Sequence, residues 1–222
     1  MAEDKIEVER QKPSKFLKAV EAFNKFADEN YRPLWKLTIG LGLLQVWVTG
    51  RMADIQKGER VVEVSSGYPF YEAYANQVGK EGVFVAIDIN PTTQTRARKI
   101  ACFVDKIRDK VGRPGPGSHQ VAADNKRLPL ENNSFDLVIA STALGFDRSE
   151  AFRILKPGGR LVWSFEEVFA LPVVTTSEKK LLAKTGFVDI ETKIGTPNLP
   201  AMWTKYLIAR KPLEITRGYI HN

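Results

Sequence analysis

The chain has 222 residues, of which 43% are hydrophobic and 27% charged, as in an ordinary soluble α/β domain with an extension. Its formal net charge of +7 favours anionic partners such as nucleic acid or a phospholipid surface. The single cysteine, Cys102, excludes an intrachain disulfide, and the two distant histidines have no cysteine partners at zinc-ligand spacing, so we expect no bound metal.

The first 56 residues are predicted to form a helical extension. Residues 1–12 are charged and lack the apolar core of a secretory signal. Ser14 can cap a helix, and apolar side chains at helical spacing predict an amphipathic helix over 14–27. A second, apolar helix is predicted over 33–49, and it is too short to span a bilayer. We expect a cytoplasmic protein whose extension packs on its own domain, or acts as a lid or as a membrane-surface element at the inner face.

Residues 57–222 are predicted to form an α/β core. Apolar, β-branched runs predict strands at 60–64, 83–87, 119–123, 135–140 and 160–165. Helices are predicted between them at 71–78, 92–110 and 149–155, with a loop at 113–117. This alternation predicts a Rossmann-like, doubly wound parallel sheet with right-handed crossovers.

The end of the core follows a different pattern. A helix is predicted at 177–184, a sixth strand at 187–193 and a seventh at 205–209. No helical pattern separates the last two strands, and a loop bearing Pro197 and Pro200 is expected to join them. We therefore expect a seven-stranded sheet that is parallel except for an antiparallel strand seven.

The first strand of the core ends in a turn of small residues, Ser65, Ser66 and Gly67. Small residues let the backbone turn sharply and approach a ligand closely. A strand, a tight turn and a helix N-terminus form the nucleotide-binding corner of an open α/β sheet. Glu63 is the unusual residue, because a carboxylate near the end of a buried strand needs either solvent or a ligand.

Polar side chains also end the next three strands, and ligands of such sheets bind outside the carboxyl ends of the strands. A carboxylate at Asp88 can accept both hydroxyls of a ribose. Asp124 and Asn125 are placed to meet the edge of an adenine, and Ile89 can pack on the face of the ring. Ser141 ends the fourth strand. Together these residues predict a nucleotide site.

These motifs resemble, in their order and spacing, those of class I S-adenosylmethionine-dependent methyltransferases of the broad group that includes the ubiquinone/menaquinone and small-molecule methyltransferases. The resemblance covers roughly residues 57–211. It rests on VVEVSSG at 61–67, VAID at 85–88, ADN at 123–125, LPL at 128–130, SFDLV at 134–138, RILKPGGRL at 153–161 and AKTGF at 183–187.

The resemblance implies S-adenosylmethionine as cofactor, with its ribose on Asp88 and its adenine near Asp124 and Asn125. The amino-acid part of the cofactor is then expected over Ser65, Ser66 and Gly67, near Glu63. The family usually has glycine where this chain has Ser65 and Pro69. A serine fits easily at a negative φ, whereas a proline removes an N–H, so the loop is expected to close differently around the cofactor.

The resemblance implies a methyltransferase, and we expect its acceptor to be a small, apolar or lipid-like molecule met near a membrane surface through residues 14–48. No catalytic residue is assigned, because in-line methyl transfer requires mainly alignment of donor and acceptor. Tyr31, Trp35, Met202 and Trp203 are candidates for the acceptor pocket, although packing is the simpler role for each.

Three alternatives stay open. A methyltransferase acting on RNA or protein is favoured by the basic residues of the predicted helix 92–110. A non-catalytic protein with a degenerate cofactor site is favoured by Ser65 and Pro69. A nicotinamide-dependent oxidoreductase is disfavoured, because the turn after the first strand lacks a Gly-x-Gly-x-x-Gly sequence.

Overall fold

The computed structural model describes residues 46–66, 72–90, 95, 106, 118–141, 146–168, 173–199 and 202–213. All of these residues lie in one of the two units into which the chain divides, Gly42–Asn222. The predicted helix 14–27, most of the predicted helices 33–49 and 92–110, and the predicted loop 113–117 lie outside the described residues. The proposed boundary between residues 56 and 57 stays a prediction.

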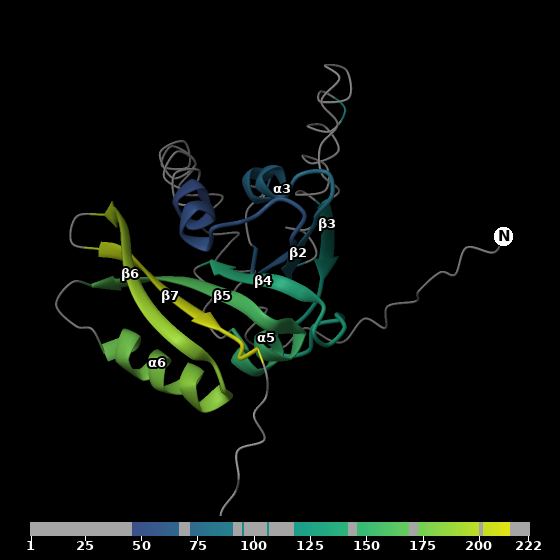
Figure 1. The fold of residues 1–222 in the computed structure, drawn as a ribbon. Coiled ribbons are helices and arrows are strands. Elements are labelled where there is room, and N and C mark those ends of the chain that lie inside the picture. Colours follow the sequence, from purple (N-terminus) through teal and green to yellow (C-terminus); the bar gives the residue numbers. More distant parts are fainter. Residues whose placement is uncertain are drawn as a thin grey trace, which may run out of the picture. The chain divides into compact units, whose positions relative to one another are not determined.

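The described residues build one mixed sheet of seven strands (Figure 1). The strands are β1 (Arg60–Val64), β2 (Val83–Asp88), β3 (Ser118–Ala122), β4 (Phe135–Ser141), β5 (Leu155–Val168), β6 (Val188–Leu199) and β7 (Met202–Arg210). Their order across the sheet is β3-β2-β1-β4-β5-β7-β6. The first five strands pair in parallel, and β7 runs antiparallel to both β5 and β6. The predicted Rossmann-like sheet with an antiparallel seventh strand is confirmed.

Helices cover both faces of this sheet, as Figure 1 shows. Strand alternation sends Val62 and Val64 to one face, where they pack with residues of α5 (Arg148–Ile154) and α6 (Val173–Thr185). Val61 points to the other face, where it packs with α3 (Glu72–Val78) and with residues 46–53, which are helical. Among the described residues, no helix is long and apolar enough to cross a bilayer.

The prediction that a loop bearing Pro197 joins the last two strands is wrong. β6 extends to Leu199 and β7 starts at Met202, so the two strands form a long hairpin. Pro197 lies inside β6, where the pairing with β7 shifts its register. A proline is tolerated there because β6 is the edge strand of the sheet, so its missing N–H is not needed by another strand.

Lys211, the residue immediately after β7, joins the sheet to α5. Lys211 is 4% exposed, and its Nζ donates to Asn133 Oδ1 at 2.7 Å and to the carbonyl oxygens of Phe152 and Leu155 at 2.7 and 2.8 Å. All three protons of the ammonium group are therefore used, and two of them satisfy carbonyls at the C-terminal end of the helix. This contact fixes the end of β7 against α5.

Candidate functional site

The turn after β1 keeps a glycine-like backbone although it carries a side chain. Ser65 has a φ of 56°, in the left-handed region that costs a non-glycine residue roughly 1–2 kcal/mol. The condition for an easy fit of a serine, a negative φ, is therefore not met. The Ser65 Oγ accepts a hydrogen bond from Asn125 Nδ2, and the Ser66 N–H donates to the carbonyl of Ile87 at 2.9 Å. These two bonds tie the turn to β2 and to the loop after β3.

The side chain of Glu63 is buried at the carboxyl end of β1. It is 3% exposed and points to the same face of the sheet as Val61. Burial raises the pKa of Glu63 to about 8; the nearby Ser141 hydroxyl lowers it and the negative charge of Asp88 raises it further. The Ser141 Oγ is itself buried and makes no hydrogen bond of good geometry. A carboxyl group in this setting is mostly uncharged at neutral pH.

Buried hydroxyl groups lie on the same face of the sheet as Glu63, and sequence reasoning missed most of them. We call Thr49, Tyr74, Ser141 and Tyr206 the hydroxyl cluster. Thr49 Oγ1 and Tyr206 OH are hydrogen-bonded at 3.1 Å, and both residues are almost fully buried. The Tyr74 hydroxyl is buried near those of Ser141 and Thr49 but makes no hydrogen bond of good geometry; burial and then the charge of Glu63 raise its pKa, and these two hydroxyls lower it. The signal that could have identified two of them is the alternation of side chains along each strand, which places Ser141 and Tyr206 on the same face of the sheet as Glu63.

The ends of β2 and β3 supply the remaining predicted residues. Asp88 is half-buried, and its Oδ1 accepts from the Asn90 N–H at 2.8 Å. Asn125 is half-buried, with its Nδ2 on Ser65 and its Oδ1 buried and unpartnered. Ile89 is 39% exposed at the same edge.

Asp124 is exposed, and its Oδ1 accepts from the Lys126 N–H at 2.9 Å, so its side chain stabilises its own turn. Gly67 lies outside the described residues. The structure therefore brings Glu63 and Ser141 together, and joins Ser65 to Asn125.

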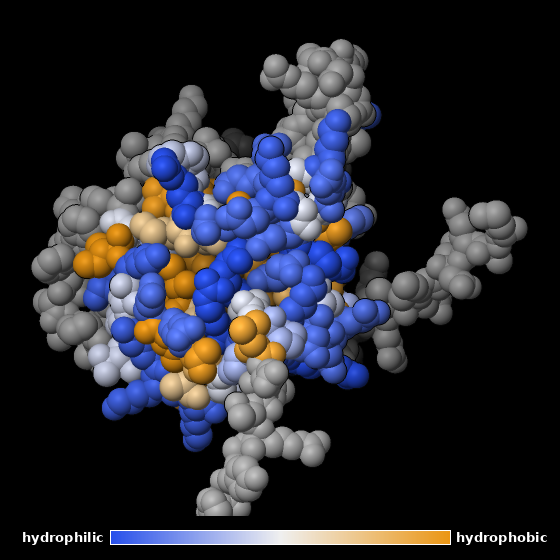
Figure 2. All heavy atoms as spheres, viewed as in Figure 1, coloured by the Kyte–Doolittle hydropathy of each residue, from blue (hydrophilic) through white to orange (hydrophobic). Residues whose placement is uncertain are grey.

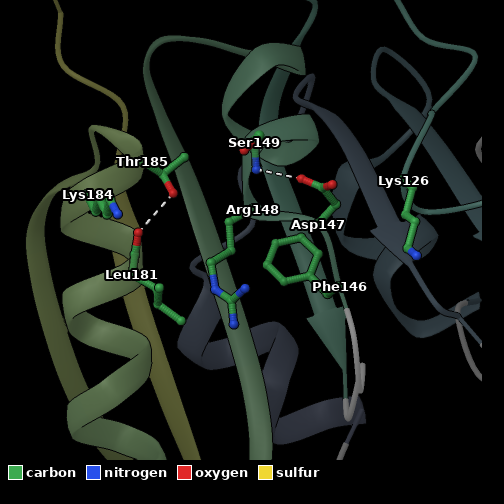
Figure 3. Close-up of a pocket in the computed structure, with 8 residues that line it drawn as sticks. All are labelled: Lys126, Phe146, Asp147, Arg148, Ser149, Leu181, Lys184 and Thr185. Carbon is green, nitrogen blue, oxygen red and sulfur yellow. Dashed lines mark hydrogen bonds between the residues drawn. The ribbon is translucent and has the colours of Figure 1, made fainter.

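A cavity of about 510 Å³ is lined by residues of α5 and α6, by Phe146 and Asp147 before α5, and by Lys126 of the loop after β3 (Figure 3). Arg148 points into it, but this side chain pairs with Glu178 and stacks on Trp163 at 5.2 Å. Asp147 caps α5 by accepting from the Ser149 N–H at 2.8 Å. Because Arg148 and Asp147 already have partners within the protein, we interpret this cavity as a gap between packed helices and not as a ligand site.

The surface and the ligand chemistry of the described residues add little to this site. Figure 2 shows separate apolar patches among hydrophilic ones on the visible face, without one continuous apolar area. No group of three or more His, Cys, Asp or Glu side chains that could hold a metal ion occurs among the described residues. The acidic edge formed by the ends of β1, β2 and β4 is therefore the candidate site.

Substitutions at Ser65 are expected to separate its backbone strain from its hydrogen bond. Ser65→Ala and Ser65→Gly both lose the bond to Asn125, but only alanine keeps a Cβ at a φ of 56°. We expect Ser65→Ala to be less stable than Ser65→Gly by about 1 kcal/mol, after the greater chain entropy of glycine is counted. Urea denaturation measures the difference, and an alanine variant as stable as the glycine variant would show that the turn carries no strain.

Comparison with known proteins agrees with this geometry. Residues 62–163 match the family described as a methyltransferase domain. The ubiquinone/menaquinone biosynthesis C-methyltransferase UbiE of Neisseria meningitidis is 30% identical over 164 residues, which are 68% of this chain and 61% of that protein. The chain thus matches less than two thirds of the length of this relative.

Solved structures share the fold at low sequence identity. The phosphoethanolamine N-methyltransferase 2 of Haemonchus contortus, solved with S-adenosylhomocysteine, has a TM-score of 0.58 and 15% identity, over 76% of this chain and 52% of that one. The [4+2]-cyclase SpnF has a TM-score of 0.59 and 17% identity, over 76% of this chain and 81% of that one. These likenesses show the fold alone, because one fold supports different chemistries.

The unpartnered atoms of the site fit the groups of an S-adenosyl cofactor. Asn125 Oδ1 is a buried acceptor without a donor, which suits the amino group of an adenine. The carboxyl group of Glu63 is buried, and no ion pair to it is found among the described residues, which suits the ammonium group of an amino acid. Two acceptors, each suited to a different donor group of the cofactor, therefore lie at the same edge of the sheet.

Proposed function

We propose that this chain, whose core is a class I S-adenosylmethionine-dependent methyltransferase domain, transfers a methyl group to a small acceptor that is apolar or lipid-like. The observation that carries the proposal is the acidic carboxyl edge of the sheet, where Glu63 and Asp88 end neighbouring strands. The role in ubiquinone and menaquinone biosynthesis that names the UbiE relative supports this class of acceptor. The apolar and amphipathic sequence of residues 14–48 supports an encounter at a membrane surface.

The residues of the site would act by binding and alignment. When bound, S-adenosylmethionine supplies a methyl group on a sulfonium, which an acceptor attacks in line. Asp88 would hold the ribose hydroxyls, Asn125 the adenine, and Glu63 the ammonium group. Holding donor and acceptor in one geometry replaces a collision between two free molecules, and this alone can contribute several kcal/mol to lowering the barrier. No general base is assigned to this chain.

The location and organisation of the protein belong to the same proposal. We place it in the cytoplasm, with residues 1–56 as an extension that acts as a lid or contacts the inner face of a membrane. The alternatives remain a methyltransferase for RNA or protein and a non-catalytic protein. The second is favoured by one observation, because Ser65 keeps a side chain at a φ of 56° where the family usually has glycine.

Transfer of label tests the acceptor class. The full chain is incubated with S-adenosylmethionine labelled in the methyl group, together with anionic vesicles that contain a prenylated hydroquinone, RNA or a protein mixture. We expect label in the lipid extract of the hydroquinone reaction only, and a higher rate with anionic than with neutral vesicles because the chain carries a net charge of +7. Label in RNA or protein alone would support the runner-up, and cofactor binding without transfer to any acceptor would support the non-catalytic protein.

A further inference from the structure

Glu63 is buried near uncharged hydroxyls and one second carboxylate. The polar groups around it come from several elements of the described part of the chain. Ser141 of β4 and Asp88 of β2 lie next to it, Tyr74 of α3 lies near it, and Thr49 of the helix at 46–53 and Tyr206 of β7 lie in turn beside Tyr74. Asp88 is the only charged group among them. Burial and a nearby carboxylate both disfavour the ionised form of Glu63, and no cation among the described residues offsets them.

A bound S-adenosyl cofactor would shift Glu63 from its protonated form toward its ionised form. The amino-acid end of an S-adenosyl cofactor carries an ammonium group, and an opposite charge in contact with a carboxyl group favours its ionised form. The Glu63 carboxyl then gives its proton to the solvent, while the ammonium keeps its own protons. Binding therefore releases one proton at any pH at which the free Glu63 is protonated and the bound Glu63 is not.

Two buried hydroxyls that make no hydrogen bond of good geometry, those of Tyr74 and Ser141, lie near that carboxylate. Tyr74 is fully buried, its hydroxyl lies near those of Ser141 and Thr49, and it is close enough to Glu63 for the charge of Glu63 to raise the pKa of Tyr74. A phenol can donate one hydrogen bond to an ionised carboxylate. Tyr206 carries the same group, but its hydroxyl is paired with Thr49 instead.

We propose that binding of the amino-acid end of the cofactor releases one proton from Glu63, and that Tyr74 is the positioning residue for the resulting carboxylate. This inference rests on the proposed function, since it places the cofactor of that function at the acidic edge. It assigns to Tyr74 a role that acts through Glu63, without contact to the methyl group. It also links the helix at 46–53, through Thr49, to the cofactor site.

Calorimetric titration in buffers of different ionisation enthalpy counts the protons released on binding. The probe is S-adenosylhomocysteine, which has the same amino-acid end, and 5′-methylthioadenosine is the control because it keeps the adenine and ribose but lacks the ammonium. At pH 7 we expect S-adenosylhomocysteine to release about one proton and methylthioadenosine to release none. Affinity for S-adenosylhomocysteine should rise about tenfold from pH 6 to pH 7, because the pKa of Glu63 lies near 8.

The outcomes separate this inference from the proposed function. Binding of S-adenosylhomocysteine without proton release in the wild-type protein would overturn the inference alone, and this result needs no variant. Failure of both S-adenosylhomocysteine and S-adenosylmethionine to bind would overturn the proposed function. Glu63→Gln should bind without proton release and without the pH dependence, and a full proton released by this variant would also overturn the inference.

Tyr74→Phe and Tyr206→Phe form the matched pair for the positioning role. Loss of the Tyr74 hydroxyl should weaken S-adenosylhomocysteine binding by about tenfold at pH 7, with a smaller effect at pH 9, because the carboxylate loses a donor and its proton becomes harder to remove. Tyr206→Phe should change affinity less than about twofold. A pH profile of Tyr74→Phe that matches the wild-type profile would contradict the role of Tyr74.

Discussion

The ligand-free protein is expected to lose stability as the pH rises from about 5 to about 8, and Glu63→Gln is expected to remove most of this loss. The pKa of Glu63 is raised from 4.5 to about 8, so the native state holds a proton that the unfolded state has released over this interval. Stability contributed by a raised carboxyl pKa is present below the unfolded pKa and is lost as the pH rises through the folded one. The limiting slope is about 1.4 kcal/mol per pH unit.

Urea denaturation of wild-type protein and of Glu63→Gln at several pH values measures this slope. The matched control is Glu191→Gln, because the side chain of Glu191 is 64% exposed on the edge strand β6. We expect the control to follow the wild-type profile, since an exposed carboxyl group has nearly the same environment in both states. A Glu63→Gln profile parallel to that of the wild type would show that Glu63 is ionised in the native protein.

Removal of the Asp88 carboxylate is expected to have the largest effect on cofactor binding. A hydrogen bond to a charged group contributes about 1.5–3 kcal/mol, so Asp88→Ala should weaken S-adenosylmethionine binding by roughly tenfold to over a hundredfold. Asp88→Asn should lose less, because its amide oxygen can still accept from one ribose hydroxyl. Equilibrium dialysis with labelled cofactor measures both variants, with Glu191→Ala as a control for the loss of one negative charge.

The order and direction of the strands could be predicted because the sequence carries those signals locally. β1, β2 and β4 are mostly apolar, as strands buried on both faces require. The β6–β7 hairpin could not be predicted, because Gly195 and Pro197 have the composition of a loop. In the structure a Cβ on Gly195 would collide with the ring of Tyr206, so the glycine serves close packing within a strand.

The candidate site was predictable only where its residues end strands. Glu63 and Asp88 stand out because charged side chains interrupt apolar runs. Thr49 and Tyr206 are 157 positions apart, and only the fold brings their hydroxyls together. Tyr74 lies on the apolar face of a short helix, where the sequence pattern does not distinguish it from an ordinary core residue. The positive φ of Ser65 was equally hidden, because most serines at strand ends adopt negative values.

The central claim is that the acidic edge formed by β1, β2 and β4 holds S-adenosylmethionine. Calorimetric titration of the wild-type protein with S-adenosylmethionine tests it most directly. We predict saturable binding of one cofactor per chain with a Kd well below about 1 mM, which corresponds to more than about 4 kcal/mol. Absence of binding at about 1 mM cofactor, or equal affinity in the wild-type protein and in Asp88→Ala, would contradict the claim.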